Sequence, residues 1–104
     1  MSHPRHHLDE VIHAPVRFSI VATLKSCDKA EFAFVREAIE VSDSVLSKQI
    51  SQLQAAGYVT VTKGYVGKRP RTWLSITDVG RAAFAAHCDA LRAIAAGEFG
   101  QAPS

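Results

Sequence analysis

Cationic side chains are concentrated in one short stretch of this chain, KGYVGKRPR at 63–71. They are Lys63, Lys68, Arg69 and Arg71. No Asp or Glu occurs between Asp43 and Asp78, so the stretch is electropositive although the formal net charge of the chain is only +2. Cations at a hairpin end often serve only to keep an edge strand soluble. Beside a DNA-reading element, they could bind phosphate groups, with Tyr65 stacking or contacting sugar.

A polar cluster precedes this basic stretch. It consists of Ser44, Val45, Ser47, Lys48, Gln49, Ser51 and Gln52. Leu46, Ile50 and Leu53 recur among them at i, i+4 and i+7, which predicts a helix with one buried side and an outward face of short polar side chains. Such a face fits a DNA major groove about 12 Å wide. Any solvated helix face is polar, so this pattern indicates DNA binding only in combination with the basic stretch next to it.

The elements that would position both clusters follow from the spacing of apolar residues and from the residues that typically begin or end helices and strands. We expect helices at 15–27, 31–41, 42–57 and 77–97, and strands at 58–63 and 72–76 joined by a long basic tip. Ser42 is the expected N-cap of the third helix and Gly57 its terminator, while Phe34 and Val35 should face the core. The chain should be mainly α with a small β-hairpin. One domain should span 8–97, between a flexible arm at 1–7 and a flexible tail at 98–104.

The sequence resembles a known family over 8–94. The stretch SDSVLSKQISQLQAAGYVTV, the basic hairpin and LSITDVGRAAF are similar to bacterial winged helix-turn-helix regulators of the MarR and ArsR type, in particular compact single-domain MarR-like proteins. The resemblance implies the order α-α-α-β-wing-β-α and a homodimeric transcription regulator on an inverted repeat. It implies contacts to bases and nearby phosphates from Ser44, Val45, Ser47, Lys48 and Gln49, with wing contacts from Arg69 and Arg71. Gln49 stands where ArsR-type proteins often carry His.

The last predicted helix supports dimerisation independently of the resemblance. It is apolar around most of its circumference, so it needs cover on more than one side, and a monomer of 104 residues offers little. The first helix is the expected partner surface, and the chain should dimerise through its terminal helices. An ordinary alanine-rich surface helix is the alternative. The residues expected at the dimer interface are Phe18, Phe84, His87, Cys88, Leu91 and Ile94.

Metal and enzyme chemistry find little support. His87, Cys88 and Asp89 are consecutive, so they diverge by about 100° each around a helix and cannot converge on one ion. Cys27 and Cys88 form no C-x-x-C pair, which fits a reducing cytoplasm and packed core thiols. Neither a phosphate loop nor an assembled nucleophile is recognisable. We expect no enzyme activity, no cofactor, no metal site and no membrane span.

The function we predict is sequence-specific binding of double-stranded DNA by a cytoplasmic homodimer, with repression as the expected outcome. One alternative is a winged-helix module that binds proteins, because the fold alone does not specify a partner. Another is a regulator that responds to a small-molecule effector or a metal, which would change the spacing of the paired third helices.

Overall fold

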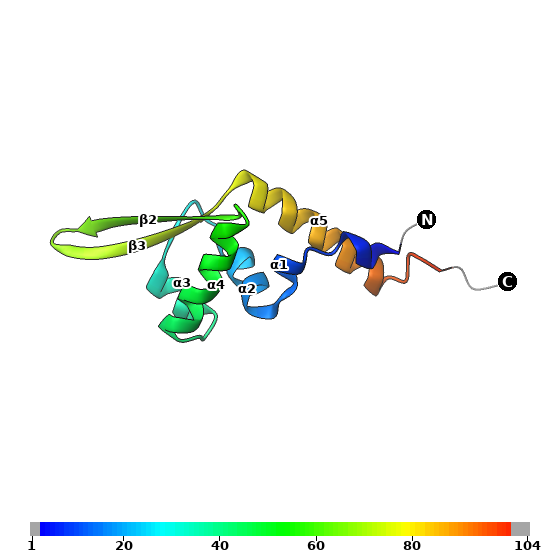
Figure 1. Ribbon diagram of the computed structural model, residues 1–104, viewed down its shortest axis with the longest axis horizontal. Coiled ribbons are helices and arrows are strands. Elements are labelled where there is room, and N and C mark those ends of the chain that lie inside the picture. The colour runs from blue at the N-terminus through cyan, green and yellow to red at the C-terminus, as the bar shows by residue number, and fades with distance from the viewer. Residues whose placement is uncertain (1–2, 101–104) are drawn as a thin grey trace.

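The computed structural model describes residues 3–100, and residues 1–2 of the predicted arm and 101–104 of the predicted tail lie outside them. Helices form most of the structure, with a small sheet beside them (Figure 1). In chain order the elements are η1 (Pro4–His7), α1 (Glu10–His13), α2 (Pro15–Leu24), β1 (Ala30–Glu31), α3 (Phe32–Ala38), α4 (Asp43–Ala55), β2 (Val59–Val66), β3 (Arg69–Ile76) and α5 (Asp78–Ala95). The predicted winged-helix order is confirmed.

The sheet is antiparallel, with β3 in the centre, β2 along one side and the two-residue β1 along the other. The expectation of a loop at 63–71 is wrong for most of this stretch. Strand pairing between β2 and β3 continues from Lys63 opposite Thr72 to Val66 opposite Arg69. Only Gly67 and Lys68 connect the strands. Gly67 has φ +63, which a tight two-residue hairpin turn requires at its first central position. The wing is therefore a long, fully paired hairpin.

The core lies where α1, α2, α3, α4, α5 and the base of the sheet meet. On α4 the predicted stripe is confirmed, since Leu46, Ile50 and Leu53 are all buried. Strand β3 buries alternate residues, Leu74 and Ile76. The remaining fully buried apolar side chains come from the other helices and are Ile12, Ile20, Val21, Leu24 and Val35.

Side-chain caps fix the beginnings of two helices that bear on function. Ser42 caps α4 as predicted, accepting a hydrogen bond from the Val45 amide at 3.2 Å. Thr77 caps α5 through the Gly80 amide at 2.9 Å, and its hydroxyl donates to the Gly57 carbonyl at 2.7 Å. The Thr77 contacts join the end of the α4 segment to the start of α5, so the two helices hold a defined relative position.

Helix α3 departs from the sequence prediction. Glu31, expected in a helix, lies with Ala30 in β1, where Ala30 pairs with Leu74. The helix that follows packs Phe32 and Val35 against the core, whereas Phe34 is 58% exposed. The expectation that Phe34 faces inward is therefore wrong, because Phe32 and Val35 already occupy the inner side of this short helix.

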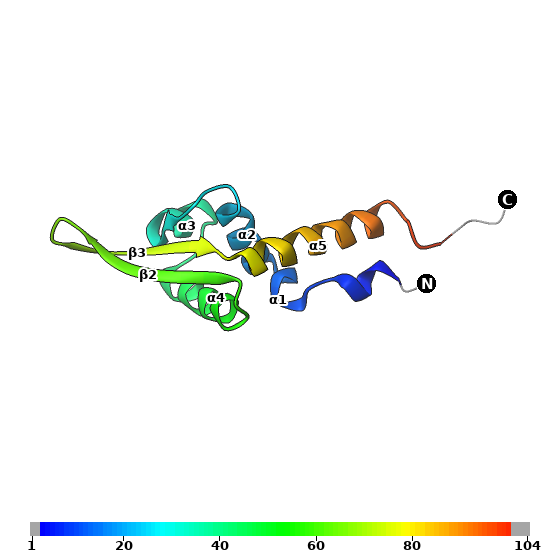
Figure 2. The ribbon, with the colours of Figure 1, turned by 90° about the horizontal axis from the view of Figure 1, so that it is seen from above.

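The described part of the chain is elongated, measuring 68 × 25 × 21 Å. Its radius of gyration, 16.4 Å, exceeds the roughly 13 Å of a compact domain of this length. The wing projects at one end and α5 at the other (Figure 2). Part of the predicted arm, Pro4–His7, forms a 3-10 helix that contacts α5. None of the described helices has the length and apolar character needed to cross a membrane.

Candidate nucleic-acid interface

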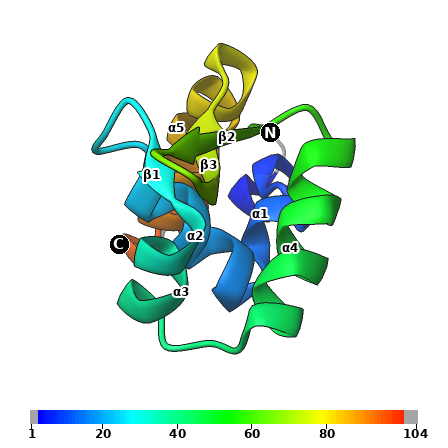
Figure 3. The same cartoon turned by 90° about the vertical axis from the view of Figure 1, so that its left-hand side faces the viewer.

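Helix α4 presents the polar face that its sequence predicted. It stands along one flank of the molecule, across the loop from α3, with its outer side uncovered by other elements (Figure 3). Gln49 is half-buried at the edge of this face. The exposed members are Ser44, Val45, Ser47, Lys48, Ser51 and Gln52.

The acidic residue at the start of α4 is paired. Asp43 accepts a hydrogen bond from Arg36 Nη1 on α3 at 2.6 Å. This hydrogen bond, together with the charge of Asp43, raises the pKa of the Arg36 guanidinium. Because Arg36 offsets the Asp43 carboxylate, the beginning of α4 is less repulsive to a phosphate than its sequence suggests.

The wing exposes three of its four predicted cations, Lys63, Lys68 and Arg69, and Tyr65 is 74% exposed. Arg71 differs, since it is half-buried and lies 3.5 Å from the Glu31 carboxylate. Sequence reasoning missed this pair, because Glu31 lies outside the acid-free stretch and comes close only when β1 pairs with β3. The outermost positive charge of the wing therefore belongs to Lys68 and Arg69.

A groove of about 490 Å³ runs between α4 and the wing, and it brings the two predicted clusters together. Ser47 and Ser51 line it from α4, and Lys63 and Thr72 line it from the hairpin. The Ser51 hydroxyl donates to the Ser47 carbonyl at 3.0 Å, and the lining Asp43 carboxylate is paired with Arg36. The remaining donors on the facing walls, the Ser47 and Thr72 hydroxyls and the Lys63 ammonium, are suited to hold the phosphates of one strand. Thr72 and Gln54, which also lines the groove, were not predicted, because only the register of the hairpin brings them to it.

The residues expected at a dimer interface lie in two different environments. His87 is fully buried and Phe84 is 6% exposed, and the Phe18 and Phe84 rings lie 5.2 Å apart within the chain. Packing between α2 and α5 therefore already covers the two α5 residues, and His87 offers no surface to a partner. Phe18, Cys88, Leu91 and Ile94 keep partial exposure, so their role stays a prediction.

A hydrogen-bond network around Asp9 ties three parts of the fold together. The Asp9 amide donates to His87 Nδ1 on α5 at 2.9 Å, and its carboxylate caps α1 and accepts from the Tyr58 hydroxyl beyond α4. The bond to Asp9 raises the pKa of Tyr58 to about 12. Burial lowers the pKa of His87. The Nε2 atom of His87 is buried without a partner in the described chain. No pattern in the sequence indicates this network.

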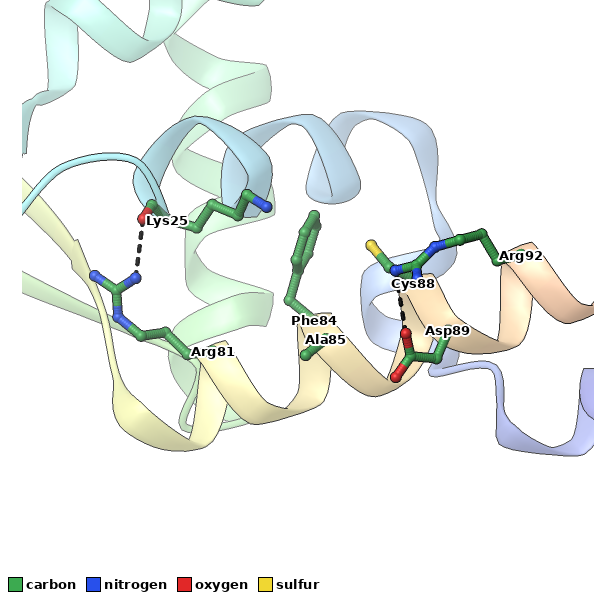
Figure 4. A pocket seen from close by; sticks show the side chains of 7 residues that line it. All are labelled: Lys25, Arg81, Phe84, Ala85, Cys88, Asp89 and Arg92. Atoms are coloured by element: carbon green, nitrogen blue, oxygen red, sulfur yellow. Dashed lines mark hydrogen bonds and ion pairs between the residues drawn. The ribbon is translucent and has the colours of Figure 1, made fainter.

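A second cavity, of about 310 Å³, lies between the end of α2 and α5 (Figure 4). Phe84 forms its apolar wall, and the charged side chains around it are Lys25, Arg81, Asp89 and Arg92. Arg81 donates to the Lys25 carbonyl at 2.9 Å, and Arg92 pairs with Asp89 at 3.1 Å. Cations therefore outnumber acids around the opening. Over residues 3–100, no three His, Cys, Asp or Glu side chains gather as a metal site would require.

Comparison with known proteins agrees with this geometry. Residues 16–95 match the family described as winged helix DNA-binding domain. An uncharacterized protein of Methanocaldococcus jannaschii is 29% identical over 75 residues, which are 72% of this chain and 82% of that protein. A transcriptional regulator homologue from Pyrococcus horikoshii superposes with a TM-score of 0.84 at 26% identity, covering 95% of this chain and 99% of that one.

Two more distant structures share the fold. A MarR-family transcriptional regulator from Silicibacter pomeroyi has a TM-score of 0.65 at 22% identity, covering 97% of this chain and 68% of its own. The transcriptional regulator MosR from M. tuberculosis, solved in complex with DNA, has a TM-score of 0.68 at 18% identity, covering 96% and 74%. With most of its length matched by the family and its helices and wing arranged as in these regulators, this chain belongs to the winged helix DNA-binding domain family and has a MarR-like fold.

Proposed function

We propose that the protein is a sequence-specific DNA-binding transcription regulator in which α4 enters the major groove and the wing holds the flanking backbone. The observation that carries the proposal is the groove between α4 and the hairpin, lined by donors from both. Ser44, Val45, Ser47, Lys48, Ser51 and Gln52 would face base edges and nearby phosphates. Lys63, Tyr65, Lys68, Arg69 and Arg71 would contact the backbone or an adjacent minor groove.

We further propose that two copies bind an inverted repeat and repress transcription. The partly exposed apolar residues of α5 support pairing through the terminal helices. Two-fold pairing would set the two α4 helices about one helical turn of DNA, roughly 34 Å, apart. A dimer bound within a promoter would block access of the polymerase, which is the simplest route to repression.

Selection from random duplex DNA tests the proposal. The purified protein should enrich an inverted repeat, and variants Lys48→Glu and Arg69→Glu should lose the enrichment because reversed charges repel phosphate. Arg5→Glu is the matched control, since it makes the same charge change on the exposed η1 at the opposite end from the wing (Figure 1). If no sequence is enriched, or if the Lys48 and Arg69 variants select the same sequence as strongly, the proposal is wrong and a protein partner becomes the better explanation.

The cavity between α2 and α5 favours a second role, response to a small anionic effector. Phe84 is 6% exposed and its ring lies under the Lys25 ammonium, so Ala85 and Cys88 are the lining residues that would contact an apolar ring. Arg81 and Arg92 would bind its carboxylate. Calorimetric titration with benzoate as a probe should show saturable binding that is weakened by Arg81→Ala together with Arg92→Ala. Equal binding by this double variant, or no binding to the unsubstituted protein, would remove the effector role and leave DNA binding intact.

A further inference from the structure

Gln49 occupies a special place on α4, at the boundary between the core and the outward face. Its neighbours at i−4 and i+3 are Val45 and Gln52, and both are exposed. Gln49 itself is half-buried on the side toward α2. One end of its side chain is thus held by the protein, while its helical neighbours lie on the proposed DNA-reading face.

Arg17 of α2 determines which end of the Gln49 amide is held. Its Nη1 donates to Gln49 Oε1 at 2.6 Å, and its Nε donates to the Val11 carbonyl, which fixes the guanidinium from a second direction. Arginine has donors only, so the atom of Gln49 that faces Arg17 must be the amide oxygen. The orientation of the amide is therefore dictated by chemistry.

The amide nitrogen of Gln49 has a different environment. It donates to no group in the described chain, and it is absent from the buried side-chain atoms that lack partners, so it keeps some exposure to solvent. Oxygen and nitrogen lie on opposite sides of the planar amide. With the oxygen turned to Arg17, Gln49 offers two N–H donors outward.

We propose that Arg17 is a specificity-determining positioning residue, which makes Gln49 a donor-only reader of the major groove. A glutamine with both ends available reads adenine by accepting from N6 and donating to N7. With its amide oxygen turned toward Arg17, Gln49 would instead present its N–H donors to the base, which suits guanine with its acceptors at both O6 and N7. The inference rests on the proposed function, which places α4 in the major groove.

The test measures base preference at single positions. The tightest duplex recovered from a random-sequence selection is varied one base pair at a time, symmetrically in both half-sites, and the affinity of each variant is measured. The unsubstituted protein should prefer guanine over adenine at one half-site position. In Arg17→Met that preference should fall about ten-fold, on the order of one bidentate base contact, because the amide oxygen is released.

A double-variant cycle distinguishes this role from support of the fold. In a Gln49→Ala background, Arg17→Met should leave the base preference unchanged, because the coupling passes through Gln49. Arg36→Met is the matched control, since it removes another arginine bonded to α4, at Asp43, and should keep the guanine preference. An unchanged preference in Arg17→Met, or a shift that persists without Gln49, overturns the inference while DNA binding stands. No selected sequence at all would overturn the proposed function with it.

Discussion

Asp9 makes hydrogen bonds to residues far from it in the sequence. Its amide binds His87 on α5, and its carboxylate binds the Tyr58 hydroxyl and the amides of α1. Because Tyr58 directly follows the α4 segment, Asp9 connects the proposed dimer helix to the proposed reading helix. His87 must be neutral at Nδ1 to accept the Asp9 amide, which makes this connection sensitive to protonation.

The stability of the protein should fall with acidification through His87. Burial lowers the pKa of His87 and the nearby His13 adds to the lowering, while Asp9 opposes it. The unfolded chain binds a proton near pH 6.5 and the folded chain binds it only at lower pH, so the free energy of unfolding decreases as pH falls below about 6.5. Urea denaturation between pH 7 and pH 5 measures this slope.

Two histidine variants test whether His87 is responsible for this pH dependence of stability. His87→Asn keeps an acceptor for the Asp9 amide and cannot titrate, so its slope should be smaller. His6→Asn, which removes an exposed histidine of η1, should keep the slope of the unsubstituted protein. Equal slopes in all three proteins would show that His87 does not carry the pH dependence.

At the residue scale, the sequence predicts which side chains lie on α4 and the wing better than it predicts which side chains bond to one another. The polar residues of α4 and the wing cations were predictable, because helical periodicity and the absence of acids are visible in the chain. The hydrogen bond from Arg17 to Gln49 and the ion pair of Arg71 with Glu31 were not. Both join residues distant in sequence, and only the packing of α2 on α4 and of β1 on β3 brings them together.

At the scale of elements, the close packing of α5 against the start of β2 depends on Gly80, which has no side chain. A Cβ on Gly80 would overlap the Tyr58 carbonyl oxygen and lie 3.0 Å from Ile76 Cγ1. Gly80→Ala should therefore destabilise the fold by about 1–3 kcal/mol, although alanine favours a helix by about 1 kcal/mol over glycine. A thermal melt should show a midpoint lower by several degrees, at about 4–8 °C per kcal/mol.

Gly100→Ala is the control for this melt, because a Cβ there would meet nothing within 4 Å. It should melt with the unsubstituted protein. A Gly80→Ala protein that melts at the same temperature or higher would mean that the approach of α5 to Tyr58 is looser than the structure shows.

The elements themselves were predictable to different extents. Helices α4 and α5 carry capping residues and regular apolar spacing, and both begin where Ser42 and Thr77 predicted. Strand β1 has two residues and depends on pairing with β3, so no local pattern reveals it. The wing was predicted too short, because glycines within 63–71 indicated a loop while cross-strand pairing overrode them.

For the whole molecule, the long axis separates two surfaces, the wing with α4 toward one end and the projecting half of α5 at the other (Figure 1). The end of α5 lies against η1 and little else of the chain, which leaves Ile94 partly exposed. We therefore expect sedimentation equilibrium to show a concentration-dependent dimer. Ile94→Asp should weaken the dimer at least ten-fold, because a carboxylate would be buried in an apolar interface.

Ala55→Asp, which places an acid at an exposed position at the end of α4, should leave the dimer unchanged. Circular dichroism checks that both variants stay folded. A folded Ile94→Asp protein with the dimerisation constant of the unsubstituted chain would show that this part of α5 is not the interface.

The salt dependence of DNA affinity tests the central claim most directly. If each protomer neutralises about three to five phosphates, log affinity against log salt concentration should have a slope of about −5 to −9 for the dimer. Replacing Lys68 and Arg69 together by alanine should make the slope shallower by about 3–4, because up to four phosphate contacts are lost per dimer. Arg5→Ala should not change it. A slope near zero, or one that the loss of Lys68 and Arg69 leaves unaltered, would contradict binding of DNA by α4 and the wing.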